Sequence, residues 1–258
     1  MQGLNLARKR MICVCGAGGK TSLIFALARE FAAMGENVLI TATTRLGRHE
    51  CQGRFRVAKA QGAGALVALA STLVPGGDVV IACSGPDPGG EKLVGFPPET
   101  LDAVFRAGVF DRILVEADGS RRKPLKAPGD HEPVFCETAD GVVVVAGMNG
   151  VGRELTDEAL FRADRWSAIT GLRRGDRITP ASVAAMIAHA DGSARGCPAQ
   201  TPISVFLNRA DSDAGARNAR DILRLLVLHD GGRRLHAVAG WLHPAPGILV
   251  PAGNCATR

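Results

Sequence analysis

The residues best suited to chemistry form a glycine-rich run close to the N-terminus. Gly16-Ala17-Gly18-Gly19-Lys20-Thr21-Ser22 follows a short apolar stretch and opens an amphipathic one. Glycine lets the backbone approach phosphate closely, and successive N–H groups at a helix N-terminus bind anions. Lys20 would reach the terminal phosphates, and the Thr21 hydroxyl would bind Mg²⁺. The run therefore predicts a P-loop in which all seven residues contact a nucleoside triphosphate.

The spacing of this run departs from the usual P-loop. The common pattern has its first glycine at the position that Val14 occupies here. The shorter spacing, Gly16-x-x-Gly19-Lys20-Thr21, is also seen in Mur-type ligases. A glycine-rich turn that binds no nucleotide is the alternative, but the strand, loop and helix order favours the P-loop.

Two carboxylates end a second apolar run, residues 113–120 (ILVEADGS). A buried strand that ends in acids is where P-loop proteins hold the residue linked to Mg²⁺. Glu116 and Asp118 alternate toward one face, so both are candidate metal ligands with Thr21 and candidate catalytic residues with Lys20. Asp118 has the simpler alternative of capping a turn, whereas Glu116 inside an apolar strand would otherwise be buried unpaired.

Residues 205–211 (VFLNRAD) match the Asn-Lys-x-Asp pattern of guanine-specific P-loop proteins, with Arg209 in place of lysine. Asp211 would accept hydrogen bonds from guanine N1–H and N2–H₂, which adenine lacks, and Asn208 would bind the other edge of the base. Arg209 would cover the ring face. An Asx turn after a strand is the alternative interpretation. The sequence thus predicts Mg²⁺ with ATP or GTP and leaves the base open.

A basic loop interrupted by prolines follows the two acids directly. It contains Arg121, Arg122 and Lys123, and shortly afterwards His131 and Glu132. Arginine and lysine suit phosphate or another oxyanion, and His131 and Glu132 suit proton transfer or metal ligation. These five residues are predicted to hold a substrate opposite the terminal phosphate, against the alternative of a solvated loop.

Alternating strands and helices must position these residues. Short, β-branched runs predict buried strands at 11–15, 37–41, 78–83, 112–117, 141–146, 203–208 and 236–241. Amphipathic stretches predict helices at 20–34, 98–107, 156–169, 180–190 and 213–228, while 84–96 suits a small hairpin and 119–133 a loop. The alternation predicts an α/β fold, P-loop NTPase-like, with a mainly parallel sheet covered by helices on both faces. We expect residues 1–258 to form a single nucleotide-binding domain with a helical insertion at 147–195.

The amino-acid composition limits the kinds of partner that the protein is expected to bind. A net charge of +6 and a pI near 9.2 favour anionic ligands, but there is no tyrosine and only 4% of residues are aromatic, so nucleic acid is not expected. No apolar run approaches the roughly 20 residues that span a bilayer. The first apolar run is too short for a signal peptide. These features predict a cytoplasmic protein with no membrane partner.

The seven cysteines follow neither a CxxC nor a zinc-ligand spacing. We expect reduced, buried packing residues. Cys15, beside the P-loop, is the one candidate for a thiol or soft-ligand role.

On these motifs the chain resembles the YqeC family, described as selenium-dependent molybdenum-hydroxylase accessory proteins or selenium cofactor biosynthesis proteins. The matching segments are GAGGKTSLIFALA (16–28), VLITATTR (38–45), LVEADGSRRKPLKAP (114–128), HEPV (131–134) and VFLNRAD (205–211). The resemblance implies a P-loop protein that helps to mature molybdenum hydroxylases, with a hydroxylase client as partner. One departure is Arg162-Ala163-Asp164, where a His-Arg-Pro-like element is expected.

Three functions are compatible with these residues. The leading hypothesis is a Mg²⁺-dependent nucleoside triphosphatase that acts as a maturation factor. The second is an ATP-dependent phosphotransferase or ligase that acts on a small anionic acceptor. The third is a non-catalytic protein whose affinity for a client is gated by nucleotide.

Overall fold

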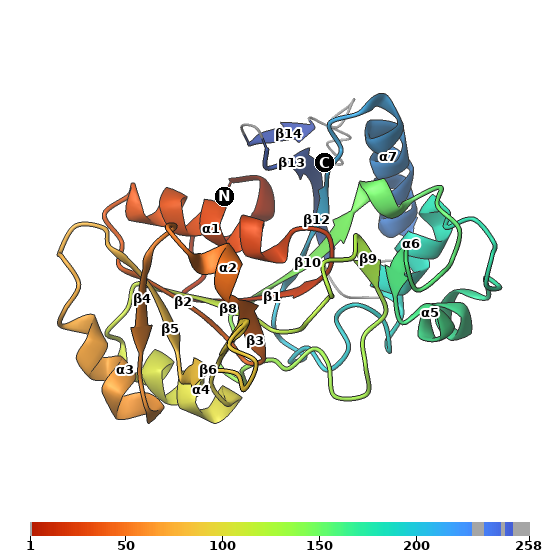
Figure 1. Ribbon diagram of the computed structural model, residues 1–258. Coiled ribbons are helices and arrows are strands. Elements are labelled where there is room, and N and C mark those ends of the chain that lie inside the picture. Colours follow the sequence, from red (N-terminus) through yellow and green to blue (C-terminus); the bar gives the residue numbers. More distant parts are fainter. Residues whose placement is uncertain (1, 229–234, 244–245, 250–258) are drawn as a thin grey trace.

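A nine-stranded sheet forms the centre of the protein in a computed structural model, which describes residues 2–228, 235–243 and 246–249. Its strand order is β14-β13-β12-β10-β1-β8-β2-β5-β4. All neighbouring strands run parallel except β13 and β14. The predicted α/β fold with a mainly parallel sheet is therefore confirmed (Figure 1).

Each predicted strand coincides with a strand of this sheet to within one residue at either end. The strands are β1 (Met11–Gly16), β2 (Val38–Ala42), β4 (Arg56–Lys59), β5 (Val79–Cys83), β8 (Arg112–Glu116), β10 (Gly141–Gly147), β12 (Ile203–Asn208), β13 (Leu235–Trp241) and β14 (Gly247–Leu249). The two edge strands, β4 and β14, were not predicted. β4 is largely exposed and carries a charged residue at each end, and β14 is only three residues long and partly buried, so neither resembles the longer buried runs of the central strands.

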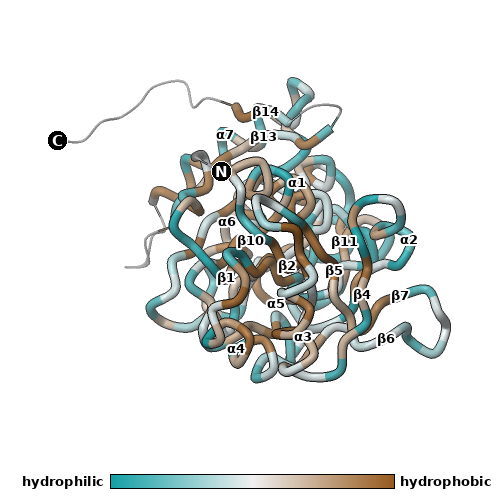
Figure 2. Tube along the Cα trace, turned by 90° about the vertical axis from the view of Figure 1, so that its left-hand side faces the viewer, coloured by the Kyte–Doolittle hydropathy of each residue, from teal (hydrophilic) through white to brown (hydrophobic). Residues whose placement is uncertain are grey.

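Helices cover both faces of the sheet. On one face lies α1 (Lys20–Ala32), and on the other lie α3 (Gly62–Ala70), α4 (Pro98–Ala107), α5 (Ala163–Thr170), α6 (Pro180–Ala188) and α7 (Asp213–Leu228). Side chains of β1 alternate between the two cores: Ile12 and Val14 pack with Leu23 and Phe31 of α1, whereas Cys13 packs on the opposite face. The central strands are accordingly among the most hydrophobic parts of the chain in Figure 2.

Several short elements complete the fold. The remaining helical turns are η1 (Gln2–Leu4), α2 (Arg48–Cys51) and η2 (Met148–Gly150). The predicted hairpin is confirmed as β6 (Gly85–Pro86) paired with β7 (Lys92–Val94), which also pairs with β3 (Arg45–Gly47). Within the predicted loop, β9 (Leu125–Lys126) pairs with β11 (Leu160–Phe161) in parallel. This small pairing joins the basic loop to residues 148–202, the connection between β10 and β12 that carries α5 and α6.

The helix predicted at 156–169 is wrong in its first half. Leu160 and Phe161 belong to β11, and Arg162 has a left-handed φ of 66°, so α5 begins only at Ala163. Pairing with β9 overrides the helical periodicity there.

The predicted burial of the cysteines is confirmed for six of them: Cys13, Cys15, Cys51, Cys83, Cys136 and Cys197 are buried and reduced. Cys255 lies outside the described residues. In the part of the chain that the structure describes, no helix combines the length and apolar character needed to cross a membrane.

The topology brings the candidate residues to one edge of the sheet. From β1 the chain crosses to β2 on one side, whereas from β10 it crosses to β12 on the other. Such a reversal opens a crevice at the carboxyl ends of the strands, where ligands of α/β sheets bind.

Candidate functional site

The glycine-rich run joins β1 to α1 at this edge. No side chain caps α1, so the first N–H groups of the helix are left for an anion. Gly16, Gly18 and Gly19 have φ values of 94°, 88° and 127°, which favour glycine. A Cβ on Gly16 would strike the carbonyl oxygen of Val145, and one on Gly18 would lie 2.5 Å from the nitrogen of Gly147. Close packing against β10 thus also requires glycine.

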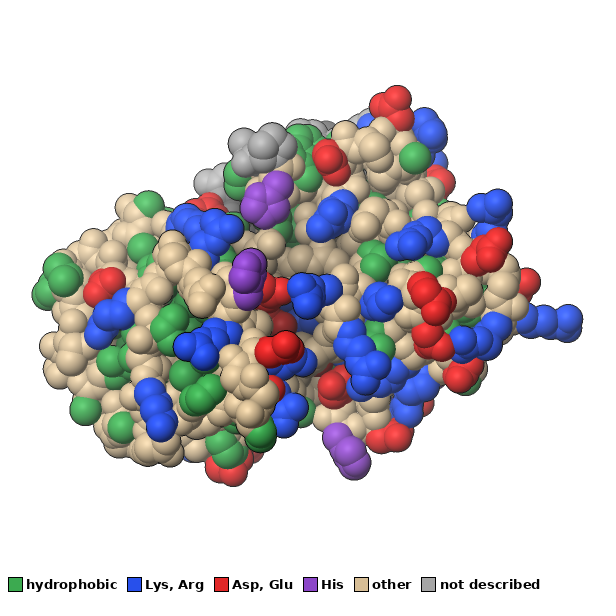
Figure 3. Space-filling view, in the orientation of Figure 1, with side chains coloured by type: hydrophobic (Ala, Val, Ile, Leu, Met, Phe, Trp, Pro, Cys, Tyr) green, Lys and Arg blue, Asp and Glu red, His purple; other side chains and the backbone are tan. Residues whose placement is uncertain are grey.

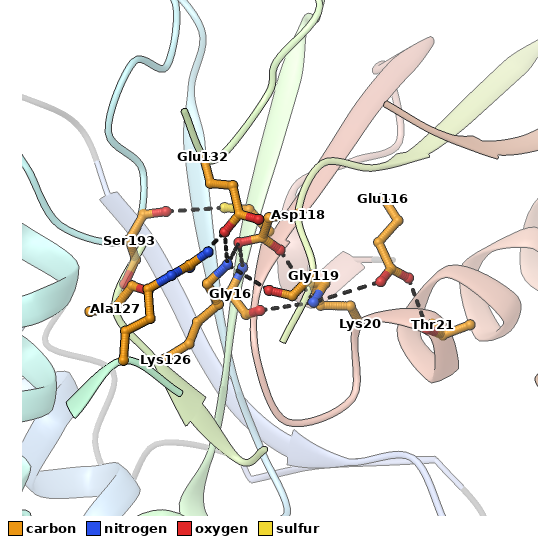
Figure 4. Close-up of polar contacts among 12 residues, drawn as sticks. Gly16, Lys20, Thr21, Glu116, Asp118, Gly119, Lys126, Ala127, Glu132 and Ser193 are labelled. Carbon is orange, nitrogen blue, oxygen red and sulfur yellow. Dashed lines mark hydrogen bonds and ion pairs between the residues drawn. The ribbon is translucent and has the colours of Figure 1, made fainter. Parts of the chain in front are cut away.

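Lys20 is buried between the loop and β8 (Figure 4). Its Nζ donates to the carbonyl oxygen of Gly16 at 2.9 Å and lies 3.2 Å from Asp118 Oδ1 and 3.7 Å from Glu116 Oε1. Burial opposes the charged ammonium, but the two carboxylates outweigh burial and raise the pKa of Lys20. Lys20 is therefore a fixed positive charge at the start of α1.

Thr21 and Glu116 meet beside it. The Thr21 hydroxyl donates to Glu116 Oε2 at 2.8 Å. Burial raises the pKa of Glu116, and Lys20 and Thr21 offset that rise only in part, so a further cation would stabilise the carboxylate. A hydroxyl and a carboxylate are oxygen ligands of the kind that Mg²⁺ takes, so these residues fit the ion.

Protein ligands alone do not complete a metal site. Among the residues described, no three His, Cys, Asp or Glu side chains are grouped to hold a metal. Magnesium in nucleotide sites commonly uses one or two protein ligands together with phosphate oxygens and water. Thr21 and Glu116 match that sparse kind of site.

Asp118 connects the P-loop to the basic loop. Its carboxylate is almost wholly buried and accepts the N–H of Gly16 at 3.1 Å. The same oxygen lies 2.8 Å from Lys126 Nζ, and the other faces Lys20. In this arrangement Asp118 holds the loop and two lysines, while Glu116 is the acid next to Thr21.

Lys126, a cation of the basic loop, and Arg162 were not among the residues predicted to form the site, and the structure places both in it. Lys126 Nζ lies 2.7 Å from both the Gly119 carbonyl oxygen and Glu132 Oε2, and Arg162 Nη1 is 2.7 Å from the same Glu132 oxygen. Burial works to raise the pKa of Glu132, but hydrogen bonds from Arg162 and Lys126 outweigh it and lower the pKa to about 2. The available signal was the apolar flank of Lys126 in PLKAP, which is unusual for a solvated loop.

The predicted substrate residues divide into two groups. Arg121 and Arg122 have left-handed φ values of 49° and 59°, and Arg121 stacks 4.8 Å from the centre of the Phe161 ring. Lys123 Nζ donates to the carbonyl oxygen of Glu158 at 2.7 Å. Arg121 and Lys123 therefore lie beside β11 and the residues that precede it.

His131 and Glu132 instead line an open pocket of about 510 Å³. Its other lining residues are Gly129, Asp130, Arg162 and Arg165. Figure 3 shows acidic and basic side chains next to one another in the middle of the face that it draws.

The predicted base-reading segment touches the P-loop through one residue. Asn208, at the end of β12, donates from Nδ2 to the Gly18 carbonyl oxygen at 2.7 Å. A Cβ on Gly19 would collide with this amide. Arg209, with a left-handed φ of 61°, and Asp211 are exposed. The structure thus brings Asn208 to the phosphate loop and leaves Arg209 and Asp211 at the surface.

Cys15 is held as a thiol. Burial, reinforced by Asp118, raises its pKa well above the usual range, and Sγ donates to the carbonyl oxygen of Ser193 at 3.4 Å. A protonated, buried thiol is a poor nucleophile or soft ligand, which favours the packing role.

Comparison with known proteins gives two matches. The family described as YqeC protein matches residues 12–164, a range that includes the P-loop, both acids and the basic loop. The chain is also similar to a protein of Escherichia coli (strain K12) named "Uncharacterized protein YqeC". The two are 32% identical over 223 residues, which cover 86% of this chain and 85% of the relative.

Proposed function

The chain belongs to the YqeC family, and on that premise we propose that it is a Mg²⁺-dependent P-loop nucleoside triphosphatase that serves as a maturation factor for molybdenum hydroxylases. The observation that carries the nucleotide part is the meeting of Lys20, Thr21 and Glu116 at the uncapped start of α1. A cation, a hydroxyl and a carboxylate at a helix N-terminus are what a nucleotide–Mg²⁺ site requires.

Each residue has a role in this proposal. The N–H groups of residues 16–22 would bind the phosphates, and Lys20 would stabilise negative charge on the terminal one. Thr21 and Glu116 would hold Mg²⁺, which when bound supplies positive charge to the phosphate oxygens. Asp118 would complete the catalytic set by positioning Lys20 and the loop.

Phosphate binding requires Lys20 to turn from Asp118 toward the nucleotide. That movement does not leave Asp118 without partners, because Lys126 and the Gly16 N–H remain bonded to it. A buried carboxylate that keeps partners avoids the large cost of an unpaired charge.

In this proposal the bound nucleotide is a guanine nucleotide. The hydrogen bond from Asn208 to Gly18 supports a base loop formed by residues 208–211, since such a loop must lie next to the phosphate loop. Asp211, two residues beyond an exposed Arg209, would accept the two donors that distinguish guanine from adenine.

The accessory role rests on the resemblance described above, which implies a molybdenum hydroxylase as client and selenium insertion as the step assisted.

A specific observation favours a second candidate, a phosphotransferase or ligase with a small anionic acceptor. The pocket beside His131 and Arg162 is joined to Asp118 by the ion pairs of Lys126. The third candidate, nucleotide-gated binding without hydrolysis, uses the same P-loop.

Product analysis separates these functions. Purified protein is incubated with ATP or GTP, with and without Mg²⁺, and with a co-purified hydroxylase. Free phosphate supports the triphosphatase, a phosphorylated or ligated product supports the second candidate, and intact bound nucleotide supports the third. Calorimetry that finds no nucleotide binding, or equal affinity in a folded Lys20→Ala variant, would overturn the P-loop assignment.

A further inference from the structure

The open pocket beside the basic loop has exposed ion pairs at its mouth. Two arginines approach the Asp130 carboxylate: Arg165 Nη1 is 2.6 Å and Arg195 Nη1 is 3.8 Å from its Oδ1. Arg195 is also paired with a second exposed carboxylate, since its Nε lies 3.4 Å from Asp191 Oδ1. The Asp130 side chain is 70% exposed, and exposed ion pairs contribute little and open easily. An incoming anion can therefore replace Asp130 without breaking a buried interaction.

The inner wall of the pocket is rigid. Arg162 bonds to Glu132 at 2.7 Å and to the carbonyl oxygen of Ala127 at 3.2 Å, and its guanidinium stacks 4.3 Å from the centre of the Phe161 ring. A Cβ on Gly129 would lie only 2.9 Å from Arg162 Nη2, so the guanidinium packs on the bare glycine backbone. Three contacts and one close approach fix its position.

Backbone strain gathers at the same place. Arg121, Arg122 and Arg162 all have left-handed φ values, which cost free energy in residues with a side chain, and the guanidinium groups of Arg121 and Arg162 both stack on Phe161. Such conformations persist where the surrounding structure enforces them, commonly at ligand sites. The strain thus supports a binding role for this wall over a purely solvated loop.

We propose that this pocket binds a small oxyanion, a phosphate or carboxylate group, in the place now taken by the Asp130 carboxylate between Arg165 and Arg195. Guanidinium forks match both kinds of oxyanion in geometry and charge. A volume of about 510 Å³ suits a small molecule. His131 and Glu132 would contact the remainder of that molecule. The inference deepens the second candidate of the proposed function, the phosphotransferase or ligase, and it rests on that candidate for one point, that the bound molecule is the acceptor.

The test isolates this site from the P-loop. Inorganic phosphate and citrate are titrated by calorimetry into full-length protein that carries Lys20→Ala, which removes the competing phosphate site. We expect one of the two to bind. Arg165→Ala should weaken that binding at least about tenfold, the loss typical of a charged hydrogen bond. Asp130→Asn should strengthen it, because it removes the competing carboxylate and no fold-determining contact.

Two further variants sharpen the result. Gly129→Ala should weaken binding because its methyl group displaces Arg162. Arg174→Ala is the matched control, since Arg174 is an exposed arginine paired with Asp157 and Asp164 away from the pocket, and it should have no effect. Binding of phosphate alone or of citrate alone would identify the class of oxyanion.

The inference is overturned if neither anion binds to the Lys20→Ala protein, or if Arg165→Ala and Asp130→Asn leave affinity unchanged. Nucleotide binding by the wild-type protein is measured in parallel. Its absence would refute the proposed function while leaving the pocket result standing, so the two failures are distinguishable.

Discussion

Lys20 and Lys126 bind the two oxygens of one buried carboxylate, that of Asp118, at 3.2 and 2.8 Å. From Lys126 the chain of ion pairs continues to Glu132 and Arg162. The phosphate loop and the pocket are therefore joined by alternating charges. If bound nucleotide draws Lys20 away, Lys126 remains as the cation paired with Asp118. By linkage, nucleotide binding should then change the affinity of the pocket beside Arg162 for its ligand.

Removing Lys126 should destabilise the fold more than removing Lys123, the half-buried lysine of the same loop. Lys126→Met leaves Asp118 and Glu132 short of a cation, and breaking a buried pair from one side costs about 3–5 kcal/mol. Lys123→Ala is the control, with an expected change within about 0.5 kcal/mol. Urea unfolding measures both. Equal effects would contradict the role given to Lys126.

Glu116→Gln should abolish the gain in nucleotide affinity that Mg²⁺ provides. The amide can still accept the Thr21 hydrogen bond but lacks the charge that the metal needs. Affinity measured in EDTA should stay the same as in the wild type. The exposed Glu99→Gln variant should keep its Mg²⁺ response. An unchanged Mg²⁺ effect in Glu116→Gln would remove this residue from the metal site.

The stabilising effect of Glu132 should depend on pH. Its pKa falls from 4.5 to about 2 on folding, so its contribution is present above about pH 4.5 and is lost as the pH falls toward 2. Wild type and Glu132→Gln are compared by chemical unfolding between about pH 7 and 3. The stability difference should be full at neutral pH and shrink below about 4.5. A difference independent of pH would argue against the ion pairs with Lys126 and Arg162.

GTP should compete better than ATP for the P-loop, and Asp211→Asn should reduce that preference. A site built around the two guanine donors rejects a base that lacks them. Asp213→Asn, a nearby exposed change in the first turn of α7, serves as control. Competition assays with both nucleotides provide the measurement, and a preference for ATP in the wild type would refute the assignment of the base.

The central sheet could be predicted because its strands are buried on both faces and form continuous apolar runs. The contact of Thr21 with Glu116 followed from the same logic, since adjacent parallel strands end at one edge. The role of Arg162 could not be predicted, because it depends on the pairing of β9 with β11. These two strands are too short to show the alternating pattern of apolar and polar residues that marks a strand in a sequence. A strand pair across 35 positions overrode a local helical pattern.

The pairing of β9 with β11 has a consequence for modularity. Residues 148–202 connect two central strands, β10 and β12, and in the order of elements they resemble an insertion that could be deleted. Yet Phe161 sits opposite Lys126 in that pairing, and the next residue, Arg162, neutralises the acid that Lys126 holds. Deleting these residues to obtain a minimal nucleotide-binding domain would therefore expose Lys126, which lies at the centre of the charge network. Residues 148–202 are therefore part of the charge network and not a separable addition to the sheet.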